Sequence, residues 1–221
     1  MMSSPPPTKQ PRVRTAAEWE AFSPPARPAS VLLADDEHLV SLAMTASLAS
    51  EGYVTVGPAV DGEQAVQLAR QAMPDIAVMD IRMPKRGGIS AAKELFRDLL
   101  IPVVIVSAYS DAEQVQAASE VGVFGYLVKP VTPDQLRAAI EIAWAAYVRF
   151  VTERKATEDL RKRLEDRRVI EQAKWLMVSH RGMTERVAVQ VLRQTARDTR
   201  RSMVDVAQQM IAELGQTPPG A

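Results

Sequence analysis

Short apolar runs alternate with amphipathic stretches over the first two thirds of the chain. The runs are rich in Val, Ile and Leu, which is typical of strands that are buried on both faces. Between the runs, apolar residues recur at the three- and four-residue spacing of a helix. The pattern predicts strands at residues 31–34, 53–60, 75–80, 102–108 and 124–129, and helices at residues 37–50, 62–72, 88–99, 111–121 and from Thr132 onward.

The alternation of strands and helices predicts an α/β fold with one parallel sheet. Each strand is followed by a helix, and right-handed crossovers then place helices on both faces of the sheet. Neither G-x-G-x-x-G nor G-x-x-x-x-G-K-[ST] follows the first strand, which argues against dinucleotide and P-loop folds. The remaining order for five strands is the flavodoxin-like 2-1-3-4-5, in which ligands bind at the carboxyl ends of the strands.

Carboxylates gather where this order brings strand ends together. The segment "VLLADDEHLV" (31–40) passes from a predicted strand directly into Asp35, Asp36 and Glu37, and Asp80 ends the third strand. One of the first acids could cap the following helix, but a cap needs only one. Because the first and third strands are neighbours in this order, the aspartates meet at one edge. Three carboxylates there form a hard oxygen site suited to Mg²⁺.

Two other strands of the predicted sheet end in polar groups. Ser107 ends the fourth strand and Lys129 ends the fifth. The carboxyl ends of parallel strands share one edge, so a hydroxyl and an ammonium group are expected beside the acids. Helix caps alone do not explain polar groups of these types on four strand ends, and the edge is therefore the first candidate site.

Beyond the predicted sheet the chain has the features of a long helix. Between Pro133 and about Ser179 there is no glycine and no further proline, and a helix of about 45 residues suggests a coiled coil or a dimerising element. An a/d alternation is followed by Ile140, Trp144, Tyr147 and Val151, and it resumes out of phase at Leu160 and Leu164. A helix that packs on its own domain fits the same positions.

Two shorter helices are predicted after Gly182. The first begins at Thr184 as N-cap, and the second begins at Ser202 and ends at Gly215. With the end of the long helix they form a small three-helix bundle. The spacing of one helix face is followed by Arg186, Gln190, Arg193, Arg197 and Arg201. This stripe is either a phosphate-binding surface or a solvated face.

Charge divides along the chain, although 27 basic and 27 acidic side chains balance overall. Residues 30–148 carry 8 basic and 15 acidic side chains, whereas residues 149–201 carry 15 basic and 8 acidic ones. An acidic module followed by a basic one favours a polyanionic partner for the second module. The absence of cysteine excludes disulfides, thiolate zinc sites and a cysteine nucleophile.

The ends of the chain complete this picture. The first 29 residues are rich in proline and predict a disordered lead, in which we expect no docking of Trp19 or Phe22 on the folded part. No apolar run approaches the roughly 18 residues that a membrane span needs, and the N-terminus lacks the apolar core of a signal peptide. We therefore expect a cytoplasmic protein without a membrane partner.

Four motifs carry a resemblance to a known family. "ADDE", "MDIRMPKRGG", "VSAYS" and "GYLVKP" occur in this order, and residues 31 to about 148 resemble the receiver domain of response regulators. The resemblance implies that Asp80 accepts a phosphoryl group from a histidine kinase. It also implies that Asp35, Asp36, Asp80 and the backbone carbonyl of Arg82 hold Mg²⁺.

The same resemblance assigns a switch. Lys129 would bind a phosphoryl oxygen, Ser107 would swing toward the phosphoryl group, and Tyr126 would follow it inward. Pro130 suggests the cis peptide bond with which such domains aim the lysine. Such a domain receives a signal and is no enzyme. We expect its phosphorylation to favour a homodimer through the fourth and fifth segments and the helix at residues 140–164.

Residues 167–211 resemble a second family, the ANTAR domain, an RNA-binding antitermination module that follows receivers in many bacteria. The residues that carry the resemblance are Ala173, Lys174, Leu176, Met177, Gly182, Ala188, Leu192, Arg193, Ala196, Arg200, Val206 and Ala207. The resemblance implies binding to paired small hairpins of nascent transcripts. RNA contacts are expected from Lys174, Arg193, Arg197, Arg200 and Arg201. The departure is Trp175, where the family usually has glycine; we expect it to pack into the bundle, with stacking on an unpaired base as the alternative.

Together the resemblances predict a response regulator that acts on gene expression by antitermination. The expected domains are a disordered lead (1–29), a receiver core (30–133), the last receiver helix with a coiled-coil linker (134–165), an ANTAR domain (166–215) and a disordered tail (216–221). Two other functions remain open. One is a DNA-binding transcription factor, although helix-turn-helix spacing is not evident in residues 184–201. The other is a regulator that acts by protein contact through its helical tail.

Overall fold

The structure is a computed structural model, and it describes residues 22–108 and 122–215 of the chain. The chain divides into two compact units between Thr152 and Glu153. The first unit contains the sheet, the second contains two short helices, and one long helix, α6 (Pro133–Arg181), contributes residues to both. In the described part of the chain, no helix is long and apolar enough to cross a membrane.

Five parallel strands form the sheet of the first unit in the order β2-β1-β3-β4-β5. The strands are β1 (Ser30–Ala34), β2 (Val54–Ala59), β3 (Ile76–Asp80), β4 (Val103–Ser107) and β5 (Val123–Val128). Each lies where an apolar run predicts it, and the flavodoxin-like order is confirmed. Successive side chains of a strand point to opposite faces, so that Leu32 packs in one core layer and its neighbours Val31 and Leu33 pack in the other.

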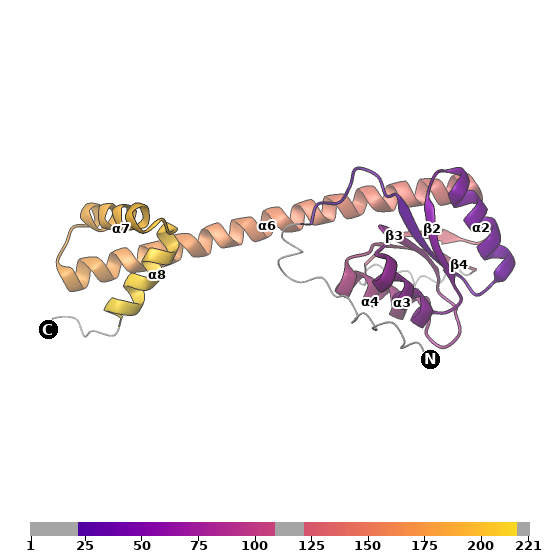
Figure 1. The fold of residues 1–221 in the computed structure, drawn as a ribbon, viewed down its shortest axis with the longest axis horizontal. Helices are drawn as coiled ribbons and strands as arrows, with labels where there is room; N and C mark the ends of the chain where they lie inside the picture. Colours follow the sequence, from indigo (N-terminus) through magenta and orange to yellow (C-terminus); the bar gives the residue numbers. More distant parts are fainter. Residues whose placement is uncertain (1–21, 109–121, 216–221) are drawn as a thin grey trace, which may run out of the picture. The chain divides into compact units, whose positions relative to one another are not determined.

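Helices cover both faces of this sheet (Figure 1). One face is covered by α3 (Gly62–Ala72) and α4 (Gly88–Glu94), which continues as a π-helical turn (Leu95–Leu99). The other face is covered by α2 (His38–Ser50) and the first part of α6. These elements confirm the predicted helices at 37–50, 62–72, 88–99 and from Thr132 onward. The helix predicted at 111–121 lies outside the described residues.

The first part of α6 packs on its own sheet. Ile140, Trp144, Tyr147 and Val151 are all buried in the core layer that also contains Val104 of β4. The Tyr147 hydroxyl donates a hydrogen bond to the backbone carbonyl of Leu100 at 2.7 Å. A coiled-coil seam through these four residues is therefore wrong, because the sheet already covers the apolar stripe that a partner helix would need.

Residues 22–29 lie against the first unit, and Phe22 and Pro25 lie against this part of α6. Phe22 packs on the same core layer, and the indole N–H of Trp144 donates to the Pro25 carbonyl at 3.0 Å. The guanidinium of Arg27 lies 4.9 Å from the centre of the Tyr53 ring. The prediction of disorder is therefore wrong for these eight residues, since a buried indole needs a hydrogen-bond acceptor and the segment supplies it. Trp19 lies outside the described residues.

Three helices form the second unit (Figure 1). The C-terminal part of α6 packs with α7 (Glu185–Thr199) and α8 (Met203–Leu214) around a shared core. The buried residues of this core are Ala173, Leu176, Met177, Ala188, Leu192, Val206, Ala207 and Leu214. Thr184 and Ser202 are the N-caps, as predicted, and Gly215 is the C-cap of α8. Ser202 and Asp205 form a capping box, in which each side chain accepts a hydrogen bond from the other residue's backbone N–H.

Candidate functional sites

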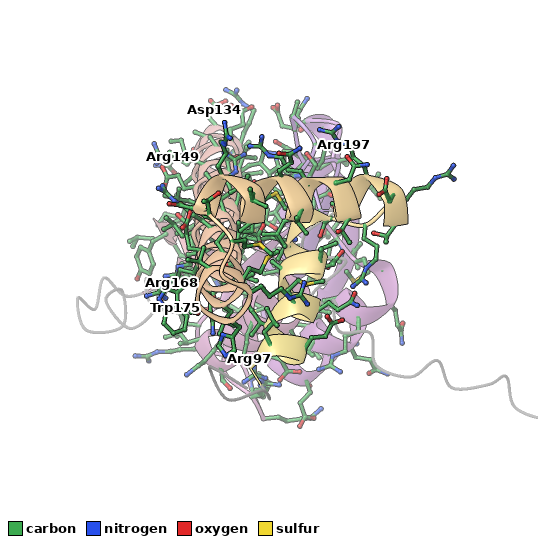
Figure 2. All side chains as sticks on the ribbon, turned by 90° about the vertical axis from the view of Figure 1, so that its left-hand side faces the viewer. Arg97, Asp134, Arg149, Arg168, Trp175 and Arg197 are labelled. Carbon is green, nitrogen blue, oxygen red and sulfur yellow. The ribbon has the colours of Figure 1, made fainter. Side chains whose placement is uncertain are left out.

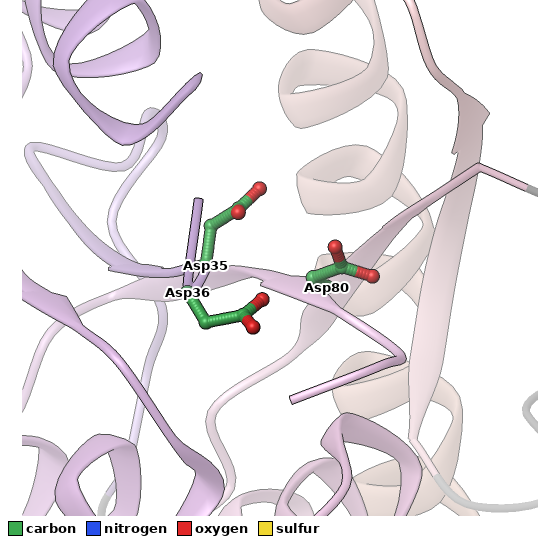
Figure 3. Close-up of side chains that lie close together, drawn as sticks. All are labelled: Asp35, Asp36 and Asp80. Carbon is green, nitrogen blue, oxygen red and sulfur yellow. The ribbon is translucent and has the colours of Figure 1, made fainter. Parts of the chain in front are cut away.

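Three aspartates meet at the carboxyl edge of the sheet (Figure 3). The register of β1 and β3 pairs Ala34 with Met79, so that the next residues, Asp35 and Asp80, lie beside each other. Asp36 adds a third carboxylate, and one ligand oxygen from each aspartate lies within 4.8 Å of the others. The strand order thus brings together acids that are about 45 residues apart in the sequence.

The environments of these carboxylates differ. Asp35 and Asp80 are buried, whereas Asp36 is exposed. Burial raises the pKa of Asp35, because the charged form is poorly solvated there. Asp35 accepts a hydrogen bond from the Glu37 N–H at 2.9 Å, and Asp80 accepts one from the Arg82 N–H at 3.1 Å. Neither Asp35 nor Asp36 is the N-cap of α2, which is Glu37; the helix-cap alternative is therefore wrong.

Lys129 provides a cation to this edge. Its ammonium nitrogen lies 2.6 Å from Asp80 Oδ2, 2.8 Å from Asp35 Oδ2 and 2.8 Å from Glu37 Oε1. Burial opposes the ammonium charge, but the hydrogen bonds to the carboxylates raise the pKa of Lys129 overall. Its backbone N–H donates to the Ser107 carbonyl at 2.8 Å, which joins the ends of β4 and β5, and the Lys129–Pro130 peptide is cis.

The donor set at the edge fits a magnesium ion. Asp35 Oδ2 is buried, and the cation beside it is Lys129 Nζ at 2.8 Å. Buried carboxylate oxygens normally have hydrogen-bond or metal partners. Two further carboxylates within 4.8 Å complete a cluster of the hard oxygen ligands that Mg²⁺ prefers.

The expected switch residues lie near the edge on two adjacent strands. Ser107 is buried at the end of β4, where it pairs with Val128. Tyr126 pairs with Ile105, two residues before that end, and packs partly buried against the core layer under α3 and α4. The structure therefore brings Ser107 to the edge with Lys129 and places Tyr126 farther back along the same strand pair.

The loop between Asp80 and α4 is held from two sides. Lys85, which has a left-handed backbone (φ 59°), contacts the buried carboxylate of Asp61 at 2.7 Å. Gly88 begins α4 so close to β3 that a Cβ atom would overlap the Asp80 carbonyl oxygen. Sequence reasoning missed the Lys85–Asp61 contact and the contact of Glu37 with Lys129. The third acid of the run "DDE" was the available signal for Glu37.

A basic stripe lies on α7 and ends with that helix. The stripe consists of the exposed residues Arg186, Gln190, Arg193 and Arg197. Together with Glu185, Val189 and Gln194 they line one shallow groove. The chain leaves the helix at Arg200, which has a left-handed backbone (φ 54°). Arg201 follows this turn and donates to Gln209 Oε1 of α8 at 2.7 Å. Its predicted place on the α7 face is therefore wrong, because the helix ends before it.

Lys174 joins two helices of the second unit. It is buried, and its ammonium nitrogen lies 2.7 Å from Glu171 Oε2 on α6 and 2.6 Å from Glu185 Oε1 on α7. These two glutamates raise the pKa of Lys174. A contact between Lys174 and RNA would require it to exchange a carboxylate for a phosphate.

Trp175 points away from the core of the second unit. Its side chain is 66% exposed, and Figure 2 shows it on the side of α6 that faces away from α8. The core residues Ala173 and Met177 lie two positions before and after it, which on a helix is nearly the opposite face. The expectation that Trp175 packs into the bundle is therefore wrong.

Comparison with known proteins follows the division into units. Residues 31–141 match the family model of the response regulator receiver domain, and residues 158–211 match that of the ANTAR domain. The transcriptional regulatory protein PdtaR of Mycobacterium tuberculosis is 38% identical over 188 residues, which cover 85% of this chain and 92% of that protein. Since the uncovered part of this chain is shorter than either family match, the similarity to PdtaR reaches into both.

Solved structures are similar to somewhat more than half of the chain. The signal receiver domain of a modulated diguanylate cyclase from Desulfovibrio desulfuricans G20 has a TM-score of 0.51 at 34% identity, and it covers 55% of this chain and 96% of its own. A two-component response regulator of the LuxR family from Aurantimonas sp. SI85-9A1 has a TM-score of 0.51 at 29% identity, over 60% of this chain and 99% of its own.

Proposed function

Because this chain belongs to the response regulators in which a receiver domain is followed by an ANTAR antitermination domain, we propose that Asp80 accepts a phosphoryl group from a histidine kinase and that the ANTAR domain binds nascent RNA. Both resemblances given by the motifs are confirmed at the family level. One observation carries the first part of the proposal: Asp35, Asp36 and Asp80 share one edge, and Lys129 Nζ lies 2.6 Å from Asp80.

The charges of the reacting groups determine what the proposed reaction at Asp80 needs. A carboxylate oxygen attacks the phosphorus of a phosphohistidine, the P–N bond breaks, and the imidazole leaves with the electron pair. The attacking and attacked groups are both anionic, so their approach needs cations. In our proposal Asp35, Asp36, Asp80 and the backbone carbonyl of Arg82 hold Mg²⁺, which neutralises phosphoryl oxygens when it is bound.

Lys129 changes partners in this proposal. Before the reaction its ammonium contacts the carboxylates of Asp35, Glu37 and Asp80. Phosphorylation removes the Asp80 carboxylate and presents phosphoryl oxygens in its place, and Lys129 then binds one of them. The Ser107 hydroxyl donates to another, and Tyr126 follows it inward, which changes the surface of β4 and β5.

A groove beside Lys129 supports a protein as the phosphoryl donor. Its lining comes from α2 and from the segment after β5, and it includes Leu39, Val40, Ala43, Pro130 and Leu136 together with Lys129. Leu39 is largely exposed although it is apolar. An apolar groove that ends at the phosphorylation site suits a helix of a kinase, which would bring its phosphohistidine to Asp80.

The second unit supplies the RNA surface in this proposal. Arg193 and Arg197 are exposed on α7, and the amide of Gln190 precedes them in the same stripe; such a stripe suits backbone phosphates. Arg200 and Arg201 follow at the end of the helix, and Lys174 takes part only if it leaves a glutamate. We propose paired hairpins as the target, because unpaired loop bases are the readable part of RNA.

A homodimer that forms on phosphorylation is the expected output. Residues 140–151 of α6 are used inside the receiver, so pairing would use the β4–β5 side of the receiver and the exposed Leu160. The proposed domains are the receiver core at 30–133, the last receiver helix with a linker at 134–165 and the ANTAR domain at 166–215. Action on nascent transcripts would place the protein in the cytoplasm.

Phosphorylation is tested by incubation with acetyl phosphate and Mg²⁺. The protein should gain one phosphoryl group that is stable in acid and labile in base, and chelation of Mg²⁺ should abolish the gain. Asp80→Asn should not be labelled. Asp98→Asn is the matched control, since Asp98 is an acid of the same unit that contacts Arg97 rather than Lys129. Equal labelling of Asp80→Asn and the wild type would show that the phosphoryl group goes elsewhere.

RNA binding is tested by filter binding to a hairpin RNA and to duplex DNA of the same length. Replacing Arg193 and Arg197 together by Ala should weaken RNA binding by on the order of 1 to 3 kcal/mol and lower the salt dependence of the affinity, because fewer counterions are released. Arg97 and Arg149, both labelled in Figure 2, belong to the first unit. Replacing them by Ala removes the same charge and should leave RNA binding unchanged. Preference for duplex DNA would favour the DNA-binding alternative.

A further inference from the structure

The exposed tryptophan of α6 carries an inference that rests on the proposed function and deepens it. We propose that Trp175 stacks on an unpaired base of the bound RNA, and that Arg161 and Arg168 bind the phosphates next to that base. The RNA then has a second contact surface in addition to the α7 stripe. This surface selects single-stranded nucleotides.

The geometry of α6 places these side chains in one row. Residues that are seven apart differ by only about 20° around a helix, so Arg161, Arg168 and Trp175 share a face. At 1.5 Å per residue the row is about 21 Å long. Leu164 lies in the same row and is 56% exposed. Figure 2 shows Arg168 and Trp175 on the same side of α6, away from α8.

Charge on this face favours a polyanion. Arg161 and Arg168 are the basic residues of the row, and they belong to a segment, residues 161–168 ("RKRLEDRR"), with five basic and two acidic side chains around the whole helix. Glu171 also lies near the row, but its carboxylate contacts Lys174 at 2.7 Å. The acid paired with Arg168 is Glu165, at 3.8 Å and with both side chains largely exposed, and such a pair contributes little. The guanidinium groups therefore remain available to phosphate.

A second copy of the chain fits this face less well than RNA does. In a parallel pair of α6 helices the seam would run through Arg161, Leu164, Arg168, Glu171, Trp175 and Val178. Each residue would then meet its own copy, and arginine would face arginine at two levels. A nucleic-acid strand instead offers phosphates to the guanidinium groups and a base face to the indole.

The chemistry of this row differs from that of the α7 stripe. The groove on α7 is lined by charged residues, amides and one valine, with no aromatic side chain among them. In Figure 2 Arg197 and Trp175 lie on different sides of the second unit. The α7 stripe therefore suits the phosphates of a stem. The Trp175 row suits unpaired nucleotides, because base faces are covered within a duplex.

The binding test uses the full chain with two probes, single-stranded oligoadenylate and an RNA duplex of the same length. Trp175→Ala should weaken binding of oligoadenylate by on the order of ten- to a hundredfold and should affect the duplex little. Trp175→Phe should retain most of the affinity, since a phenyl ring also stacks. Arg168→Ala should weaken binding of oligoadenylate. The matched control Arg163→Ala, which removes an exposed arginine from another face of α6, should weaken it less.

Tryptophan fluorescence gives a readout in the wild-type protein. The difference between the emission of the wild type and that of Trp175→Phe isolates the signal of Trp175. Stacking on a base should quench this signal when oligoadenylate is added. The indole of Trp144 is buried in the receiver and should not respond.

The outcomes separate this inference from the proposed function. If RNA binds in a manner that depends on Arg193 and Arg197, but Trp175→Ala binds oligoadenylate like the wild type and the emission is unchanged, the inference is overturned and the proposed function stands. If neither RNA probe binds, both are overturned. If Trp175→Ala alters sedimentation and leaves RNA affinity unchanged, the face pairs with a second copy and the inference is wrong.

Discussion

Two lysines, one in each unit, are nearly buried and contact carboxylates, yet their surroundings differ. Lys129 contacts Asp35 and Asp80, which are buried, and Glu37, which is exposed. Lys174 contacts Glu171 and Glu185, whose side chains are 55% and 71% exposed. Water therefore screens the negative charge around Lys174. At the sheet edge much of the negative charge has no such screening.

The difference separates a lysine at the proposed phosphorylation site from a lysine that joins two helices. At the sheet edge Asp36 adds a fourth carboxylate to the three that Lys129 contacts, so one ammonium leaves a strong attraction for a further cation. Between α6 and α7 the two glutamates face solvent, and their attraction to Lys174 serves to join the helices.

The largest effect is expected from Lys129→Met in the absence of Mg²⁺. Removing one partner of a buried ion pair costs roughly 3–5 kcal/mol, and because Glu37 is exposed we expect a loss of about 2–3 kcal/mol in the free energy of unfolding. Urea unfolding followed by the fluorescence of the buried Trp144 measures it. Lys85→Met is the control, because Lys85 is largely exposed and contacts a single carboxylate, that of Asp61. Equal losses in the two variants would contradict the contrast.

Addition of Mg²⁺ should stabilise the first unit by a smaller amount. A ligand that binds only the folded state at ten times its Kd adds about 1.4 kcal/mol to the free energy of unfolding. The same Trp144 signal should report the increase, and Asp35→Asn should reduce it by removing a charged ligand. The prediction fails if Asp35→Asn responds to Mg²⁺ as fully as the wild type does.

Lys174→Met should lower the melting temperature less than Lys129→Met does. Its partners regain water when the ammonium is lost, because both are already exposed. A double-mutant cycle sharpens this comparison. The coupling between Lys174 and Glu185, measured with Lys174→Met and Glu185→Gln, should be weaker than the coupling between Lys129 and Asp80. A stronger coupling at Lys174 would reverse our assignment of roles.

The smallest effect is expected in the pH dependence of the second unit. Lys174 holds the pKa of Glu185 below its ordinary value of 4.5. A carboxyl group whose pKa is lower in the folded state stabilises that state above 4.5, and this stabilisation is lost as the pH falls through the lowered pKa. The melting temperature of the wild type should therefore decrease slightly on acidification. Lys174→Met should show less of this decrease, and an identical decrease would rule out the pair as its source.

The sheet edge could be predicted from the sequence because it depends on strand order. Apolar runs place Asp35, Asp80, Ser107 and Lys129 at strand ends, and the parallel order 2-1-3-4-5 then determines which ends are neighbours. Contacts that depend on loop paths could not be predicted this way. Glu37 contacts Lys129, which lies 92 positions later in the sequence, and Lys85 contacts Asp61 because its backbone is left-handed.

A second feature that the sequence could not predict is which element covers a given helix face. The spacing of Ile140, Trp144, Tyr147 and Val151 shows that they share a face, but spacing does not say whether a sheet or another helix covers that face. The receiver sheet covers it. The helical spacing also led to the wrong prediction that Arg201 belongs to the α7 stripe. The sequence has no glycine or proline at the turn at Arg200, so nothing in it marks the end of the helix there.

One glycine limits how the sequence of this protein can change. Since the Asp80 carbonyl oxygen occupies the space of a side chain at position 88, a library that samples every amino acid there should return only glycine among variants that can still be phosphorylated. Alanine, the smallest replacement, already carries the excluded Cβ atom. Position 88, eight residues after Asp80, is therefore expected to tolerate no amino acid other than glycine.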